Sequence, residues 1–224
     1  MDVYDIAAGL PGIDVLRQRC KALAVLECVI DGGAPYYGYT QWGDDEAALM
    51  SNDGGDEWAV VFTGDGAFIR VFDHESAMSP YRDPDRGVWP GLTDGIPAVL
   101  SPQLKEPAFS DESGRFLATA VLWRLAGDDR WGAGAGITFP PSRGPYDPGP
   151  DGSAMLEILL DDIVDRFVEF AGDYYEMEVD RVVVEHVVAH RPLSDAVVRA
   201  LNPHATVADL RRDVAAIGYP VTVM

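Results

Sequence analysis

The sequence predicts an α+β protein in which an antiparallel β-sheet lies between an N-terminal helix and a C-terminal layer of helices. Alternating and aromatic β-forming runs occur between residues 36 and 139, several of them separated by turns rich in Gly and Asp. Apolar residues at the three-and-four spacing of amphipathic helices occur before and after this region. A Pro- and Gly-rich segment, 140–152, divides the two patterns. We therefore expect one domain of 224 residues, with a helix and sheet at 1–139, a linker at 140–152 and helices at 153–224.

The first helix is expected from Pro11 to Ile30, where one stripe carries Ile13, Leu16, Cys20, Leu23 and Leu26. Pro11 suits the first turn of this helix, and Gly32-Gly33 is expected to end the helix.

Strands are then expected at 36–42 and 47–50. The segment 51–57 (SNDGGDE) predicts a turn, because it lacks the ligand spacing and final Glu of an EF-hand loop.

A β-hairpin is predicted at 58–63 and 67–73, joined by Gly64-Asp65-Gly66. Its alternation suggests one buried and one exposed face. The Pro- and Gly-rich stretch 78–107 predicts a long loop with one helical turn near 98–104. Tyr81 and Trp89 are expected to hold this loop against the sheet, which makes it a candidate lid.

The remaining elements follow the same patterns. Strands are expected at 115–125 and 131–139, the second weakened by three glycines. A helix is expected from 156 to 170, and 174–190 predicts either a further helix or a kinked continuation. Ser194 and Thr206 are expected to cap two short final helices, the last ending at Gly218 and Pro220.

The charge balance narrows the classes of binding partner that the chain is expected to have. The chain carries 37 acidic and 17 basic residues, a net charge of −20. Such a chain disfavours nucleic acid and anionic membranes, because both require Lys and Arg. It favours a basic protein partner, although acidity that serves solubility alone is the simpler explanation. We expect a cytoplasmic protein that does not enter the membrane, since neither a signal peptide nor an apolar run of about 20 residues is found. No cofactor is expected.

Acidity is concentrated in one part of the chain. Residues 151–190 hold 11 acidic and 2 basic residues, a net charge of −9. Asp161, Asp165, Glu169 and Asp173 are expected to point away from the apolar stripe of their helix. This face is either ordinary solvated surface or a partner-binding surface.

The loop Asp73-His74-Glu75-Ser76 brings acid, imidazole and hydroxyl groups together at the end of a strand. Catalytic triads are assembled in space, and neighbours on a strand point to opposite faces, so adjacency alone does not make one. No nucleophile elbow or dinucleotide-binding motif is found. Local turn capping by Asp73 and Ser76 is the structural explanation, and partner binding is the functional one.

A second histidine arrangement is Glu185-His186-x-x-x-His190, where both histidines would share one helix face. The glutamate stands before the first histidine, unlike the order in zinc proteases. A histidine pair at a helix end is the structural explanation. As an alternative, His74, His186 and His190 could meet in space as a metal site.

Several motifs resemble a family of bacterial proteins found in actinobacteria and bacilli. The motifs are FDHES at 72–76, MSPY at 78–81, WPG at 89–91 and, in the tail, RPLSDAVVRALNP and IGYP. The resemblance extends from Leu10 to Pro220 and implies no biochemical role, so no catalytic residue is carried over. Composition and architecture are also similar to the immunity proteins of bacterial toxin systems, an analogy at the level of fold class.

These observations lead to three hypotheses. The first is non-catalytic binding of a basic protein partner. The second is a metal-dependent hydrolase using the His74 and Glu75 loop. The third is a structural subunit, for which an apolar exposed sheet edge would be the sign. The residues predicted to bind the partner are Asp73, His74, Glu75, Ser76, Tyr81, Trp89, Asp161, Asp165, Glu169 and Asp173.

Overall fold

The computed structural model describes residues 1–32, 35–83, 87–141, 144 and 149–222. Gly33 and much of the predicted 140–152 linker lie outside them. The chain divides into two compact units, each built from segments distant in sequence. The first unit comprises Met1–Ile13 and Leu49–Glu157, and the second comprises Asp14–Ala48 and Ile158–Met224. The chain leaves the first unit for the last time between residues 157 and 158, after the Pro- and Gly-rich segment.

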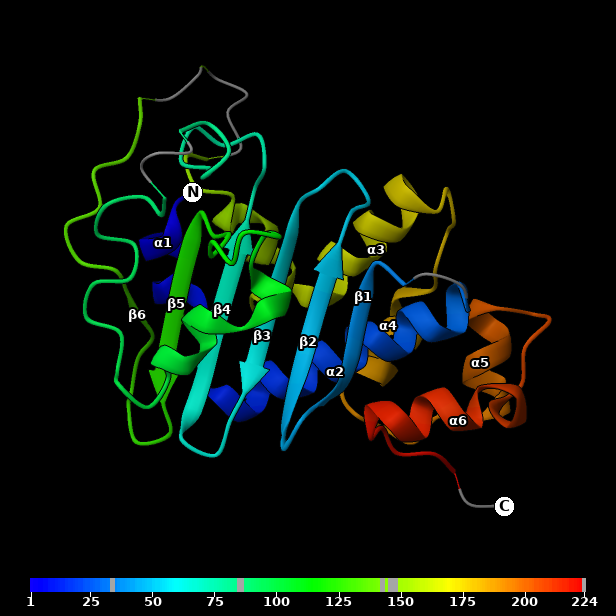
Figure 1. Ribbon diagram of the computed structural model, residues 1–224. Helices are drawn as coiled ribbons and strands as arrows, with labels where there is room; N and C mark the ends of the chain where they lie inside the picture. Colours follow the sequence, from blue (N-terminus) through cyan, green and yellow to red (C-terminus); the bar gives the residue numbers. More distant parts are fainter. Residues whose placement is uncertain (33–34, 84–86, 142–143, 145–148, 223–224) are drawn as a thin grey trace. The chain divides into compact units, whose positions relative to one another are not determined.

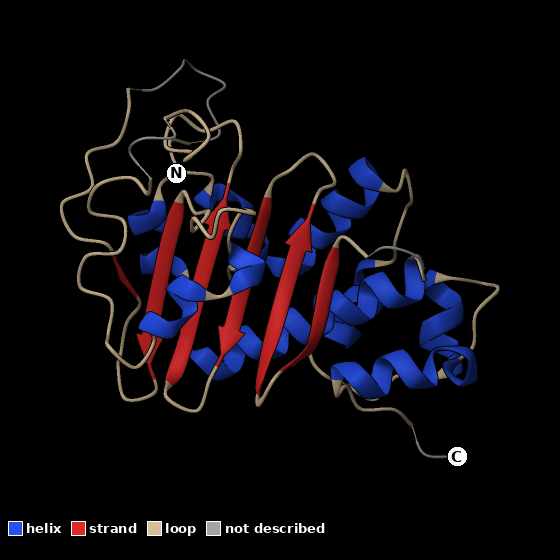
Figure 2. Cartoon of the chain, in the orientation of Figure 1, coloured by secondary structure: helices blue, strands red, loops and turns tan. Residues whose placement is uncertain are grey.

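The predicted α+β class is confirmed: the described residues form an antiparallel sheet with strands in the order β1-β2-β3-β4-β5-β6, an N-terminal helix and C-terminal helices (Figures 1 and 2). Neighbouring strands in the sheet are thus neighbours in the sequence, as in a meander. The strands are β1 (Tyr37–Trp42), β2 (Asp45–Ser51), β3 (Glu57–Phe62), β4 (Gly66–Phe72), β5 (Ala120–Leu125) and β6 (Gly132–Ala133).

The predicted hairpin is confirmed as β3 and β4, in a register that pairs Val60 with Ile69. The expectation that one of its faces is exposed is wrong, because all seven residues of β4 are buried. Segment 101–117 covers one face and includes η1 (Ser101–Lys105) and η2 (Pro107–Phe109). Arg70 of β4 accordingly donates from Nε to the carbonyl of Leu117 and lies over the ring of Phe109.

The strands predicted at 115–125 and 131–139 are shorter than expected. β5 begins at Ala120, and β6 contains two residues. After β6, a Cβ atom on Gly134 would collide with the backbone carbonyls of Gly91 and Leu92. The loop backbone therefore occupies the space beside Gly134 where a longer strand would need a partner.

A short helix that was not predicted from the sequence, α1 (Val3–Gly9), packs against β5 and β6. Asp2 caps it, and the side chain of Asp5 bonds back to the N–H of Asp2, which completes a capping box. The buried carboxylate of Asp151 accepts a further bond from the N–H of Val3 at 2.8 Å. Hydrogen bonds from distant residues thus help to hold a helix that is too short to be stable alone.

The C-terminal helices follow the predicted pattern with one break. The stripe expected as one helix from 156 to 170 forms η3 and then α3, and 174–190 contains a separate helix, α4. Ser194 and Thr206 cap the last two helices as predicted, and Gly218 ends α6 in the left-handed conformation with φ of 72°. The helices are α2 (Ile13–Ile30), η3 (Ser153–Leu159), α3 (Ile163–Tyr174), α4 (Arg181–Val188), α5 (Asp195–Leu201) and α6 (Val207–Ile217).

Candidate functional site

The loop after β4 is held from within by its own polar side chains. Asp73 Oδ1 accepts hydrogen bonds from the N–H groups of Glu75 and Ser76, both at 2.9 Å. The hydroxyl of Ser76 is buried and donates to the carbonyl of Pro150 at 2.6 Å. Asp73 and Ser76 therefore have structural roles here, while Glu75 is exposed and the ring of His74 is 38% exposed.

The carboxylate that orients His74 comes from Asp56, which the sequence analysis did not single out. Asp56 Oδ1 accepts from the backbone N–H of His74 at 3.0 Å and lies 2.9 Å from its ring Nδ1. Asp56 Oδ2 accepts from the side-chain amide of Asn52 at 2.9 Å. Burial acts to raise the pKa of Asp56, but the bonds from His74 and Asn52 outweigh it, and the pKa is lowered.

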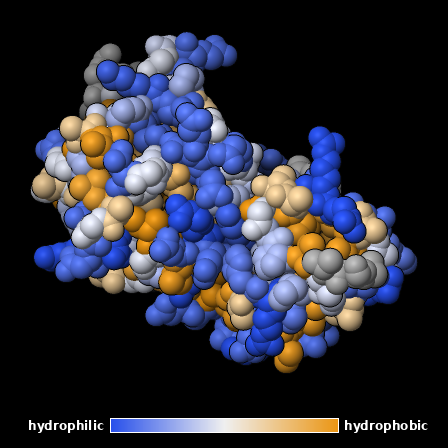
Figure 3. All heavy atoms as spheres, turned by 90° about the horizontal axis from the view of Figure 1, so that it is seen from below, coloured by the Kyte–Doolittle hydropathy of each residue, from blue (hydrophilic) through white to orange (hydrophobic). Residues whose placement is uncertain are grey.

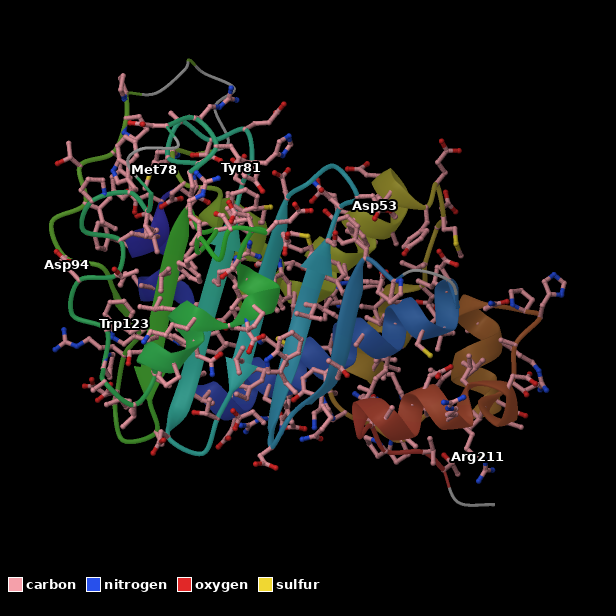
Figure 4. The ribbon with its side chains drawn as sticks, viewed as in Figure 1. Asp53, Met78, Tyr81, Asp94, Trp123 and Arg211 are labelled. Carbon is pink, nitrogen blue, oxygen red and sulfur yellow. The ribbon has the colours of Figure 1, made fainter. Side chains whose placement is uncertain are left out.

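Strand order explains why these groups meet. The β2–β3 turn, which carries Asn52 and Asp56, and the loop leaving β4 lie at the same end of an antiparallel sheet. Figure 4 shows Asp53 in that turn and Tyr81 in the loop after β4. The available sequence signal was an acidic residue immediately before β3, and the predicted hairpin register would have placed it near His74.

Tyr81 and Trp89 differ in their accessibility. The Tyr81 ring is 50% exposed and lies edge-on to Phe72, with the guanidinium of Arg115 5.6 Å from its centroid. Trp89 is half-buried, and its Nε1 donates to the carbonyl of Thr138 at 3.0 Å. The ring of Tyr81 is thus available at the surface, whereas Trp89 links the loop between β4 and β5 to the segment that follows β6.

In the second unit, the predicted acidic residues form a line at four-residue intervals along the sequence, with Asp161 just before α3 and the other three on it, and all are exposed. Asp161 pairs with Arg19 at 2.7 Å, and Asp165 pairs with Arg181 at 2.7 Å. The hydrogen bond from Arg181 lowers the pKa of Asp165. The charges of the first two residues in the line are therefore compensated within the unit.

The other two residues, Glu169 and Asp173, make no ion pair within the described residues. The chain beyond them adds two more exposed carboxylates of the same kind, Glu176 and Glu178. We call these four residues the acidic end of α3. Beside them, Tyr174 is 49% exposed and stacks on Phe170 with ring centroids 5.3 Å apart.

Glu27 of α2 is a buried carboxylate that the sequence analysis also missed. Its Oε2 accepts from the N–H of Tyr36 at 2.9 Å and from the hydroxyl of Tyr175 at 2.7 Å. Its Oε1 has no hydrogen-bond partner among the residues that the structure describes. Burial raises the pKa of this carboxyl, and the bonds from Tyr175 and Tyr36 oppose the shift without cancelling it.

Two of the three histidines of the alternative metal site, His186 and His190, contact backbone carbonyls. His186 Nε2 lies 3.1 Å from the carbonyl of Pro192, and His190 Nε2 lies 2.8 Å from that of Gln18. His74 belongs to the other unit. In the described parts of the chain, no group of three His, Cys, Asp or Glu side chains is arranged to hold a metal ion.

Comparisons with protein-family models, curated proteins and solved structures find no match to this chain. The resemblance to a bacterial family therefore stays a prediction. In the portion of the chain that the structure covers, no helix is both long and apolar enough to span a bilayer.

Proposed function

We propose that the protein is a non-catalytic binding protein whose acidic end of α3 engages a basic protein partner. The observation that supports this is a run of four exposed carboxylates between residues 169 and 178, at and just beyond the C-terminal half of α3, none with an ion pair inside the described residues. The helix dipole disfavours negative charge there. Glu169 and Asp173 also repel each other at the four-residue spacing. Cationic side chains from a partner would relieve both effects.

The aromatic neighbours of the acidic end suggest how a partner would be held. Tyr174 presents about half of its surface to solvent and is supported by its stack on Phe170. An Arg or Lys placed over such a ring gains a cation–π contact in addition to the carboxylates. We therefore expect charge to set the rate of association and Tyr174 to contribute to the lifetime of the complex.

The global charge favours the same class of partner. At a net charge of −20, the chain attracts basic proteins over a distance set by the ionic strength. Immunity proteins neutralise toxin domains in this manner, and we propose a comparable role in the cytoplasm. His74, Glu75 and Tyr81, which are exposed or partly exposed on the loop after β4 in the first unit, are proposed as an additional contact.

The test is capture of partners from cytoplasmic extract by the immobilised full-length chain, at about 0.05 M and about 0.3 M salt. A variant with the acidic end neutralised would be compared with a control in which four exposed acids elsewhere are neutralised. The test substitutions are Glu169→Gln, Asp173→Asn, Glu176→Gln and Glu178→Gln. The control substitutions are Asp44→Asn, Asp53→Asn, Asp94→Asn and Asp129→Asn.

We expect the wild type and the control variant to capture a basic protein stoichiometrically at low salt, and higher salt to release it. The test variant should fail to capture this protein. Equal capture by both variants would assign the attraction to net charge alone and reject the acidic end of α3 as the site. Tyr174→Ala then tests the aromatic contact, with faster dissociation expected at an unchanged association rate.

A second candidate function, hydrolysis at the His74 loop, is favoured by one observation. Asp56 fixes the ring of His74 through Nδ1 and leaves Nε2 available, the arrangement of an oriented acid–base histidine. Metal analysis of protein purified without chelator tests the metal-dependent version. One metal ion per chain, lost in His74→Ala, would support it, and metal-free wild type would reject it.

A further inference from the structure

A small cavity of about 270 Å³ lies in the second unit, away from the acidic end of α3. Its walls come from the start of α5, the first turns of α6 and the C-terminal segment. Leu193, Val207 and Val221 give it an apolar lining, and Asp195 and Arg211 supply the charged groups. Figure 4 shows Arg211 projecting from α6, and Figure 3, seen from below, shows apolar residues at the surface of this part of the chain.

The walls of the cavity are fixed by backbone hydrogen bonds. Leu193 and Val221 form a parallel bridge, in which the N–H of Leu193 donates to Pro220 and the N–H of Thr222 donates to Leu193, both at 2.9 Å. Leu193 is fully buried, and Val207 is 7% exposed. The cavity is thus a preformed feature of the fold, as small-molecule sites usually are.

The two charged groups at the cavity differ in their engagement. Asp195 Oδ1 accepts from the N–H of Val207 at 2.9 Å, and its Oδ2 pairs with Arg199 at 3.3 Å. Arg211 is exposed and makes no hydrogen bond or ion pair with any described residue. The charge left available beside this apolar hollow is therefore positive, in a chain whose net charge is −20.

We propose that this cavity binds a small aliphatic carboxylate, with its hydrocarbon chain against Val207 and Val221, which Leu193 supports from behind, and its carboxylate on the guanidinium of Arg211. Apolar walls with one charged anchor are the usual composition of a small-ligand site. Guanidinium and carboxylate groups match in planarity and charge. A cavity volume near the lower limit of ligand pockets points to a ligand with a short hydrocarbon chain, on the order of six carbons.

The experiment is a titration of the full-length ¹⁵N-labelled protein with hexanoate, followed by amide chemical shifts. We expect saturable shifts centred on Val207, Arg211 and Val221. Arg211→Gln should weaken binding about fivefold, the upper range for one partly exposed ion pair. Arg212→Gln is the matched control, because it removes the same charge from the next position, about 100° around the helix, and should leave affinity within about twofold.

Hexanol, which has the same chain length without the charge, provides the second comparison. We expect it to bind wild type more weakly than hexanoate and to be insensitive to Arg211→Gln. Equal affinities for hexanol and hexanoate would overturn the role of Arg211. Hexanoate shifts that do not saturate, or that lie outside the cavity lining, would overturn the site itself. Neither outcome bears on the acidic end of α3, so the two proposals fail independently.

Discussion

The buried carboxyl of Glu27 makes the stability of the second unit depend on pH. Because its pKa is raised in the folded state, the folded chain keeps a proton that the unfolded chain releases above the ordinary value of 4.5. Its contribution to stability is thus greatest below pH 4.5 and is lost as pH rises through the folded pKa. Glu27→Gln keeps an acceptor for Tyr36 and Tyr175, so we expect it to stabilise the protein at pH 7 by about 1 kcal/mol.

Denaturant unfolding of both proteins at several pH values measures this effect. The gain from Glu27→Gln should shrink as pH falls and should vanish below pH 4.5. Glu178→Gln, on an exposed side chain, serves as the control and should change stability by less than about 0.5 kcal/mol. A Glu27→Gln variant that is less stable than wild type at pH 7 would mean that the ionised carboxylate is favoured where it lies.

Asp56 has the opposite pH dependence. Its pKa is lowered because the bonds from His74 and Asn52 exceed the effect of burial, so its contribution is present above 3.8 and is lost as pH falls through the folded pKa. We expect Asp56→Asn to lower stability at pH 7 by about 1 kcal/mol. The exposed neighbour Asp53 provides the control, since Asp53→Asn should have little effect. Equal thermal shifts in the two variants would contradict the role assigned to Asp56.

Among the elements, β4 is the one most sensitive to small changes, because it is buried on both faces between β3 and β5. Its first residue, Gly66, lies so close to β5 that a Cβ atom would collide with the carbonyl of Arg124. Gly66→Ala should therefore destabilise the protein by about 2 kcal/mol or more. Gly64, two residues earlier, has no atom within 4 Å of a built Cβ. Gly64→Ala should be tolerated, and similar midpoints of denaturant unfolding for the two variants would refute the explanation.

The elements that could be predicted are those specified by local sequence. The caps at Ser194 and Thr206 and the β3–β4 hairpin depend on residues a few positions apart, and all three form as expected. The length of β6 and the start of β5 depend on segments that come from elsewhere, such as the backbone of Gly91 beside Gly134. Such contacts leave no periodic signal in the strand itself.

The candidate sites divide in the same way. His74 and the line of acidic residues from Asp161 to Asp173 could be found from residue type and spacing. Asp56 and Glu27 could not, because their importance depends on a distant partner and on burial. The ion pairs of Asp161 with Arg19 and Asp165 with Arg181 likewise join residues far apart in sequence, and they decide which acidic residues stay uncompensated.

For the whole molecule, a net charge of −20 means that electrostatic repulsion opposes the folded state. The acidic end of α3 should contribute more than its share, because its four carboxylates lack cationic partners among the described residues. Sodium chloride screens such repulsion, with a Debye length of about 8 Å near 0.15 M. We therefore expect the melting temperature of wild type to rise by several degrees between about 0.02 M and about 0.2 M salt.

The two neutralised variants separate local from global repulsion, since each removes four negative charges and both have a net charge of −16. If repulsion is concentrated at the acidic end of α3, neutralising that end should raise the melting temperature at low salt and reduce its salt dependence more than the dispersed control does. Equal behaviour of the two variants would mean that the repulsion is spread over the surface. In that case, the four carboxylates would be no less favourable for folding than other exposed acids, and the physical basis for assigning them a partner would be lost.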